Sequence, residues 1–177
     1  MQIAIFGGSF DPIHIAHEAI VKEALKTLDI EKLIVVPTYL NPFKHSFYLE
    51  PKTRFRLLQK VFEKFENVEI CDYEINQPKP SYSINTVSYL KKLYNPTKIY
   101  FIIGEDNLEN LENWHQIDEL KKFVEFVVVS RNGFKTKNAN KFILLNVDIN
   151  VSSTKLRNEI NLDYIPKEIK DDILNLK

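Results

Sequence analysis

Short apolar runs alternate with longer amphipathic stretches along the chain. The apolar runs predict strands at 2–6, 32–36, 68–71, 99–103, 123–129 and 142–145, and apolar residues at helical spacing predict helices at 14–28, 51–65, 83–93, 152–160 and from 166. Strands and helices in alternation indicate an α/β protein with a parallel sheet covered on both faces. Because such sheets bind ligands beyond the carboxyl ends of their strands, we expect the chemistry in the loops after Phe6, Val36, Ile103 and Val129.

Length and composition favour one domain spanning 1–177, since the 177 residues are 44% apolar and 27% charged. Lys+Arg and Asp+Glu both number 24, which argues against a long basic surface for nucleic acid. Cys71 is the only cysteine, so no intrachain disulfide forms, as expected in a reducing compartment. We find neither a signal-peptide pattern nor an apolar run of membrane-spanning length, and we therefore expect a cytoplasmic protein without a membrane partner.

The segment between the first strand and the first helix has the character of an anion site. Gly7 and Gly8 lack Cβ atoms and let backbone N–H groups approach a phosphate closely. The helix that follows directs its unpaired N–H groups at the same place. His14 and His17 are three residues apart and share one face of its first turn. Together with Phe-Asp-Pro at 10–12, this combination favours a functional loop over ordinary helix-start residues.

Three other phosphate or metal motifs do not fit this loop. A dinucleotide-binding turn needs G-x-G-x-x-G, and a P-loop needs G-x-x-x-x-G-K-[ST]; neither spacing occurs here. His14 and His17 have the spacing of a zinc pair, but no third ligand stands at a usual distance along the chain. We therefore predict no protein metal ligand.

A second polar segment precedes the helix predicted at 152–160. Ser152, Ser153 and Thr154 can cap that helix, and their hydroxyls and N–H groups can also bind phosphate oxygens. Arg157 follows Ser153 by four residues and projects from the same face. By itself the segment fits a simple helix cap with a solvated arginine; the first loop makes a phosphate site the better interpretation.

Both segments resemble those of the adenylyltransferase and cytidylyltransferase superfamily. G-G-S-F-D-P-I-H-I-A-H at 7–17 resembles G-x-F-D-P-x-H-x-G-H, with Ala16 where that superfamily has Gly. V-S-S-T-K-L-R at 151–157 is similar to I-S-S-T-x-I-R. The resemblance implies a single-domain, Rossmann-like, doubly wound parallel sheet of the nucleotidyltransferase type.

Further motifs resemble bacterial nicotinate-mononucleotide adenylyltransferases. P-S-Y-S-I-N-T at 80–86 is similar to P-S-Y-T-x-x-T, I-G-E-D at 103–106 to I-G-x-D, and R-N-G at 131–133 to R-P-G; Trp114 and His115 stand where that family has an aromatic pair. The loop after the second strand departs, with Thr38 and Phe43 where the family has Asn and His. Lys44 keeps the positive charge, and His45 is a candidate replacement for the missing histidine.

The resemblance implies that ATP and nicotinate mononucleotide react to nicotinate adenine dinucleotide and pyrophosphate. Positioning and electrostatics supply the catalysis, because the attacking phosphate is already ionised. Mg²⁺ is expected as cofactor, bound mainly through ATP phosphates and water. The implied site residues are His14, His17, Lys44 and Arg157 around the ATP phosphates; Gly7, Gly8, Ser9, Phe10, Gly104, Asp106, Ser152, Ser153 and Thr154 for ATP binding; and Thr86, Trp114, His115 and Arg131 for the mononucleotide.

Two other functions stay open at this point. One is a different small transferase, such as a phosphopantetheine adenylyltransferase or a glycerol-phosphate cytidylyltransferase; the pantetheine enzymes resemble T-x-G-H and lack the equivalent of His14. The other is a non-catalytic nucleotide-binding module, which would not require His14, His17, Lys44 and Arg157 together. The sequence leaves homo-oligomerisation and the strictness of nicotinate over nicotinamide selection undecided.

Overall fold

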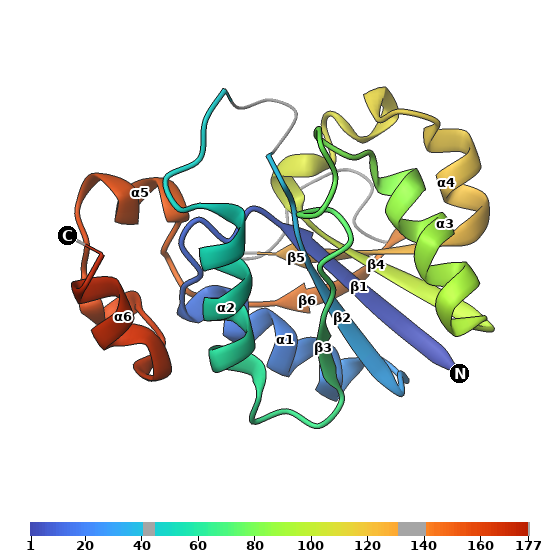
Figure 1. Ribbon diagram of the computed structural model, residues 1–177. Helices are drawn as coiled ribbons and strands as arrows, with labels where there is room; N and C mark the ends of the chain where they lie inside the picture. Colours follow the sequence, from blue (N-terminus) through green and yellow to red (C-terminus); the bar gives the residue numbers. More distant parts are fainter. Residues whose placement is uncertain (41–44, 131–140, 177) are drawn as a thin grey trace.

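Six parallel strands form one twisted sheet with helices on both of its faces (Figure 1). The computed structural model describes residues 1–40, 45–130 and 141–176. The strand order β3-β2-β1-β4-β5-β6 is that of a doubly wound fold, and it reverses between β1 and β4. The strands are β1 (Gln2–Gly8), β2 (Lys32–Pro37), β3 (Val68–Ile70), β4 (Lys98–Gly104), β5 (Glu125–Ser130) and β6 (Ile143–Asn146).

Helices follow most of these strands and return the chain to the end of the sheet where the parallel strands begin. The α-helices are α1 (Ile15–Thr27), α2 (Pro51–Phe62), α3 (Ser83–Tyr94), α4 (Ile117–Phe123), α5 (Ser153–Asn158) and α6 (Lys170–Leu174). Short 3₁₀ turns are η1 (Glu105–Asn107), η2 (Leu111–Asn113), η4 (Leu162–Tyr164) and η5 (Lys167–Ile169). Along the part of the chain that the structure describes, no helix is long and apolar enough to cross a membrane.

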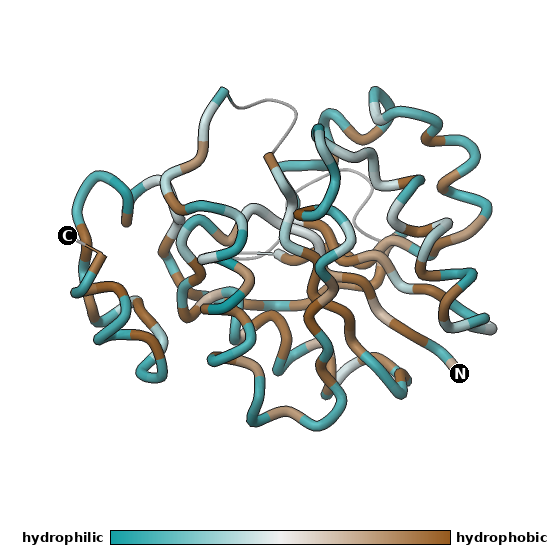
Figure 2. Tube along the Cα trace, in the orientation of Figure 1, coloured by the Kyte–Doolittle hydropathy of each residue, from teal (hydrophilic) through white to brown (hydrophobic). Residues whose placement is uncertain are grey.

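Alternate residues of the central strands build two cores, one on each face of the sheet. Ala4 and Phe6 of β1 pack with buried residues of α1, α2 and the C-terminal segment. Ile3 and Ile5 of the same strand pack with α3 and α4 on the other face. This division follows from the two-residue repeat of a strand, and Figure 2 shows the apolar residues concentrated along the strands. The two-sided burial explains why β1 and β4 are nearly continuous apolar runs.

All six predicted strands are present, with ends within two residues of the predicted ones. The prediction was wrong at Phe123, which ends α4 rather than beginning β5. Only Ile117 and Leu120 of α4 are buried, so this seven-residue helix has too short an apolar stripe to be recognised in the sequence. Ser83 is the first residue of α3, and Tyr82, not Ser83, occupies the capping position.

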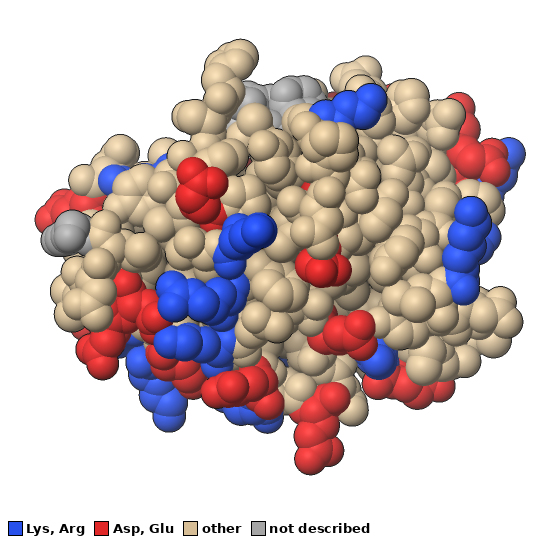
Figure 3. All heavy atoms as spheres, in the orientation of Figure 1, with Lys and Arg blue, Asp and Glu red and all other residues tan. Residues whose placement is uncertain are grey.

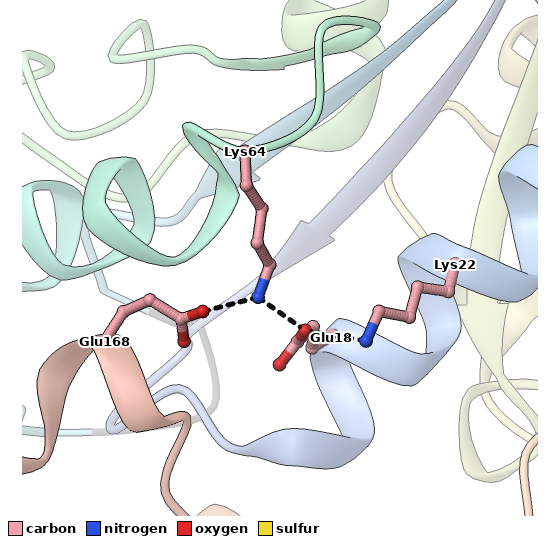
Figure 4. Close-up of polar contacts among 4 residues, drawn as sticks. All are labelled: Glu18, Lys22, Lys64 and Glu168. Atoms are coloured by element: carbon pink, nitrogen blue, oxygen red, sulfur yellow. Dashed lines mark hydrogen bonds and ion pairs between the residues drawn. The ribbon is translucent and has the colours of Figure 1, made fainter.

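An ion-pair network joins α1 to the C-terminal segment (Figure 4). Lys64 contacts Glu18 at 2.8 Å and Glu168 at 2.6 Å, and Lys22 contacts Glu18 at 2.9 Å. Burial raises the pKa of Glu18, but its bonds to Lys22 and Lys64 outweigh burial and leave the pKa below the ordinary value. Basic and acidic side chains also alternate on the surface of α2 and α6, as Figure 3 shows. These pairs link η5 and α6 to α1, α2 and the turn after α2.

Candidate active site

The loop from Ser9 to His14 leaves the sheet at the point where the strand order reverses. β1 ends at Gly8 and its parallel neighbour β4 ends at Gly104. The loops after these two strands therefore both leave the sheet at the carboxyl ends of its strands. Phe10 has a φ of 47°, which is unusual for a bulky residue and strained. Its ring packs close to Gly8, where a Cβ atom would lie 3.1 Å from it. The turn is therefore tight, and a glycine at position 8 leaves room for the Phe10 ring.

His14 and His17 form the first turn of α1 and lie face to face. Their ring centroids are 3.7 Å apart with an interplanar angle of 19°, and His14 is only 2% exposed. The backbone N–H of His14 donates to Nδ1 of His17 at 3.2 Å, so a neutral His17 carries its proton on Nε2. The Phe10 ring meets His17 edge-on at 4.9 Å. Packing thus fixes both imidazoles beside the positive end of a helix.

Backbone carbonyls of the first loop bind the second polar segment directly. Arg157 donates from Nη1 to the carbonyl oxygen of Asp11 at 2.8 Å, and Ser153 donates from Oγ to that of Pro12 at 2.9 Å. Arg157 also donates from Nη2 to Oγ1 of Thr154 at 3.0 Å. Segments more than 140 residues apart in the sequence therefore form one surface. Ser152 caps α5, its Oγ accepting from the Lys155 N–H.

An open hollow of about 510 Å³ adjoins this surface. Arg157 and Asp11 line it on one side, and His45 and the residues up to Tyr48 line it on the other. It is large enough for part of a nucleotide. Lys44, predicted to act here, lies outside the described residues, whereas His45 lines the hollow.

Gly104 and Asp106 form a close pair at the end of β4. A Cβ atom at position 104 would lie 2.5 Å from Oδ1 of Asp106, so any side chain there displaces that carboxylate. Asp106 itself is exposed in η1. The glycine therefore allows an exposed carboxylate to fold back over the strand end, where a sugar hydroxyl could meet it.

The residues predicted for the mononucleotide gather around the start of α3. His115 stacks on Tyr82 with ring centroids 4.3 Å apart. Trp114 is partly buried and meets Phe101 and Phe126 edge-on at 6.2 and 6.4 Å. The stacked pair joins the 80–86 segment to the Trp114 loop. Arg131, the fourth residue of this group, lies outside the described residues.

Thr86 is buried, and its hydroxyl donates to the carboxylate of Glu74. The resemblance implied that Thr86 meets the mononucleotide, and in the structure its hydroxyl already has an acceptor. Burial raises the pKa of Glu74 to about 7, and the bond from Thr86 opposes that rise. A carboxyl group that titrates near neutral pH therefore lies beside the predicted mononucleotide site.

Replacing Glu74 with Gln should stabilise the protein at high pH. Because folding raises the Glu74 pKa from 4.5 to about 7, its contribution to stability is complete below pH 4.5 and is lost as the pH rises through 7. Glu74→Gln keeps an acceptor for Thr86 without the charge. We expect a gain in unfolding free energy of about 3 kcal/mol at pH 8.5 and of less than about 1 kcal/mol at pH 5.

Urea denaturation of wild type and variant at the two pH values measures this difference. Glu66→Gln, at an exposed position, is the matched control and should change nothing at either pH. A gain that is the same at pH 5 and pH 8.5 would mean that ionisation of Glu74 is not its cause.

Sequence reasoning assigned no role to Arg54 or Glu74, although both are buried and both bind residues of the site. Arg54 could have been noticed, because it takes the place of an apolar residue in the stripe with Leu57, Leu58 and Val61. Glu74 follows β3 outside any regular element, where no periodicity marks a residue as buried.

The doubly wound sheet, with two polar segments joined at its switch point, has the architecture of the nucleotidyltransferase class. The cytidylyltransferase-like family model matches residues 5–159. A relative from Aliarcobacter butzleri named "Probable nicotinate-nucleotide adenylyltransferase" is 69% identical over 176 residues, covering 99% of this chain and 97% of that protein. One of the same name from Campylobacter jejuni is 47% identical, with 98% and 94% covered. The chain belongs to the nicotinate-nucleotide adenylyltransferases of the cytidylyltransferase-like family.

Solved structures show the same fold. The structure of Plasmodium falciparum nicotinic acid mononucleotide adenylyltransferase complexed with NaAD superposes with a TM-score of 0.78 at 23% identity, covering 99% of this chain and 95% of that one. A Vibrio parahaemolyticus structure described as a putative nicotinate-nucleotide adenylyltransferase gives 0.72 at 17% identity, with 98% and 99% covered. At these identities the likeness establishes the architecture, and the assignment to the family rests on the closer relatives.

Proposed function

We propose that this adenylyltransferase joins the phosphate of nicotinate mononucleotide to the α-phosphate of ATP and releases pyrophosphate. The reaction takes place beyond the carboxyl ends of β1 and β4, beside the start of α5. The observation that carries this placement is the direct binding of Arg157 and Ser153 to the carbonyls of Asp11 and Pro12. It puts the helix start with its two histidines and the cationic segment on one surface, as a site for the polyphosphate of ATP requires.

The proposed roles follow from these positions. His14, fixed against His17, stabilises the charge that builds on the α-phosphate, and His17 orients ATP through its Nε2–H. Arg157 and Lys44 bind the departing pyrophosphate oxygens, with the hydroxyls of the 152–154 segment. Asp106 binds the ATP ribose over Gly104. Gly7 and Gly8 let the first loop approach the phosphates. None of these roles needs a covalent intermediate, since alignment of two bound phosphates supplies much of the rate.

Mg²⁺ fits this site as an ion that arrives with ATP. The Asp11 carboxylate is the buried acid of the loop, and both of its oxygens accept backbone N–H bonds from Tyr48 and Leu49. It is therefore committed to the fold and not free to be a ligand. Mg²⁺ favours phosphate oxygens and water, and when bound it neutralises charge on the phosphates.

Pyrophosphate release tests the proposal. Purified protein with ATP, Mg²⁺ and nicotinate mononucleotide should release pyrophosphate and form the dinucleotide in equal amounts. CTP in place of ATP, and a pantetheine phosphate or glycerol phosphate in place of the mononucleotide, should give no product. Product only with one of those acceptors would assign the chain to another branch of the family, and ATP binding without product would indicate a nucleotide-binding module.

Trp114→Ala should weaken the mononucleotide more than ATP. Stacking of a base on an aromatic ring contributes roughly 1–3 kcal/mol, and a single pyridine ring belongs at the low end, which corresponds to about a fivefold rise in the dissociation constant. Equilibrium binding of each substrate separately measures the two effects. Trp114→Phe keeps an aromatic face and should recover most of the affinity.

Since Trp114 also contacts Phe101 and Phe126, the melting temperature of the alanine variant must be measured first. A variant that is folded and binds both substrates normally would assign Trp114 to the core alone.

Three expectations from the sequence stay predictions: a cytoplasmic location, Arg131 as the ligand of the acceptor phosphate, and self-association.

A further inference from the structure

Arg54 is a fully buried arginine whose hydrogen bonds to the described residues all go to backbone carbonyls. It lies in the first turn of α2 and is 1% exposed. Its Nε donates to the Leu49 carbonyl at 3.0 Å, Nη1 to those of Ser9 and Thr38 at 2.7 Å each, and Nη2 to that of Tyr39 at 2.7 Å. One planar guanidinium therefore holds three separate stretches of chain.

Those stretches are the two loops of the predicted ATP site and the entrance to α2. Ser9 belongs to the loop after β1 that leads to His14, and Thr38 and Tyr39 belong to the loop after β2 that leads to Lys44. Asp11 supports the third stretch, because its carboxylate accepts the N–H groups of Tyr48 and Leu49 at 2.8 and 2.7 Å. Leu49 is thus held at its N–H by Asp11 and at its carbonyl by Arg54.

Burying this charge is costly, and its surroundings only partly compensate. Burial lowers the pKa of Arg54, while the charges of Asp11 and Glu50 raise it. Packing needs no cation here, since an apolar residue of similar volume would continue the buried stripe of α2. What an apolar residue could not supply is a rigid fork of donors aimed at several carbonyls.

One water molecule could not take over this task, because it donates two hydrogen bonds and the guanidinium donates to four carbonyls. The cavity beside the guanidinium, lined by Ser9, Asp11, Thr38 and Tyr39 among others, measures about 10 Å³. That volume corresponds to about one water molecule. Without the guanidinium, carbonyls from two loops would lose their donors together, and the loops would move relative to each other.

We propose that Arg54 is a positioning residue for adenylyl transfer, which fixes the loop after β1 relative to the loop after β2 and so sets the spacing of the groups that bind the ATP phosphates. The inference rests on the proposed function in that these loops bind ATP. Because its side chain is only 1% exposed, Arg54 acts through these loops and not by contact with a substrate. Its effect on the rate arises because displacing aligned groups by about 1 Å can lower a rate on the order of 100-fold.

Two substitutions separate position from charge and from packing. Arg54→Met keeps the volume and removes the fork, and Arg54→Lys keeps the charge but offers donors from a single point. Arg56→Met is the matched control, because Arg56 is exposed on the same helix and, among the described residues, forms an ion pair only with Asp172, at 3.7 Å. For each protein we would measure the melting temperature, the dissociation constants of ATP and nicotinate mononucleotide, and kcat at least 15 °C below its melting temperature.

We expect kcat to fall on the order of 10- to 100-fold in both Arg54 variants, while the mononucleotide dissociation constant changes less than about twofold. Arg56→Met should match the wild type. A wild-type kcat in Arg54→Lys, or losses that vanish once the variants are fully folded, would overturn the proposal. Should Arg54→Met fail to fold, Arg54→Lys decides alone. A wild-type protein that releases no pyrophosphate refutes the proposed function, whereas an active wild type with equally active variants refutes only the role of Arg54.

Discussion

His14→Ala should lower kcat on the order of 100-fold or more, with a much smaller change in ATP affinity. His14 stands where charge builds during transfer, at the start of α1 and against the His17 ring. A group that binds the transition state better than the ground state affects kcat rather than binding. Rapid-quench measurement of product formation at saturating ATP, beside equilibrium binding of ATP without the acceptor, tests both parts.

His14→Asn is the informative companion. It keeps one N–H donor near the same place and should retain more activity than His14→Ala, since the role proposed for the imidazole is donation to a phosphate oxygen. The melting temperatures of both variants must show that the protein is folded, because His14 is buried and its ring packs on that of His17. An alanine variant that turns over at nearly the wild-type rate would remove His14 from the catalytic group.

The fold could be predicted because its strands are buried on both faces. Continuous apolar runs such as 99–103 have few alternatives to a central parallel strand, and the runs at 2–6, 32–36 and 99–103 each end directly before a glycine or proline. The α4 helix could not be recognised, since its stability comes from Ile117 and Leu120 packing on a core that the sequence does not display. Tertiary contact decides such short helices.

Only some residues of the candidate site could likewise be predicted from the sequence. Residues in contiguous motifs, such as His14 and His17, could be assigned together from local spacing. The contact between Arg157 and Asp11 bridges distant segments, and only the resemblance to a family suggested it. Arg54 and Glu74 act through backbone carbonyls and through Thr86, whose partners depend on the folded geometry. Residues that support a site through distant contacts are therefore harder to predict from the sequence than residues in a contiguous motif.

Nicotinate mononucleotide should be preferred over nicotinamide mononucleotide by a kcat/KM ratio on the order of 100 at pH 6. The two acceptors differ by a carboxylate and a carboxamide. A site that aims N–H donors at both oxygens suits the carboxylate, and each donor that meets the NH₂ group instead is left unpaired at a cost of about 1–3 kcal/mol. We expect these donors in the backbone near Thr86, Trp114 and His115. Both acceptors carry the same phosphate, so its titration cancels in the ratio.

The contact between Glu74 and Thr86 adds a pH dependence that the sequence did not reveal. With a pKa of about 7, Glu74 is mainly neutral at pH 6 and mainly charged at pH 8.5. Its carboxylate would then repel the nicotinate carboxylate and offer an acceptor to the carboxamide, so the preference should shrink as the pH rises. Glu74→Gln stays neutral and should keep the preference found at pH 6 across this range. Equal kcat/KM values for the two acceptors in the wild type at pH 6 would show that the site does not select the carboxylate, whereas a preference that persists unchanged to pH 8.5 would place Glu74 too far from the acceptor to matter.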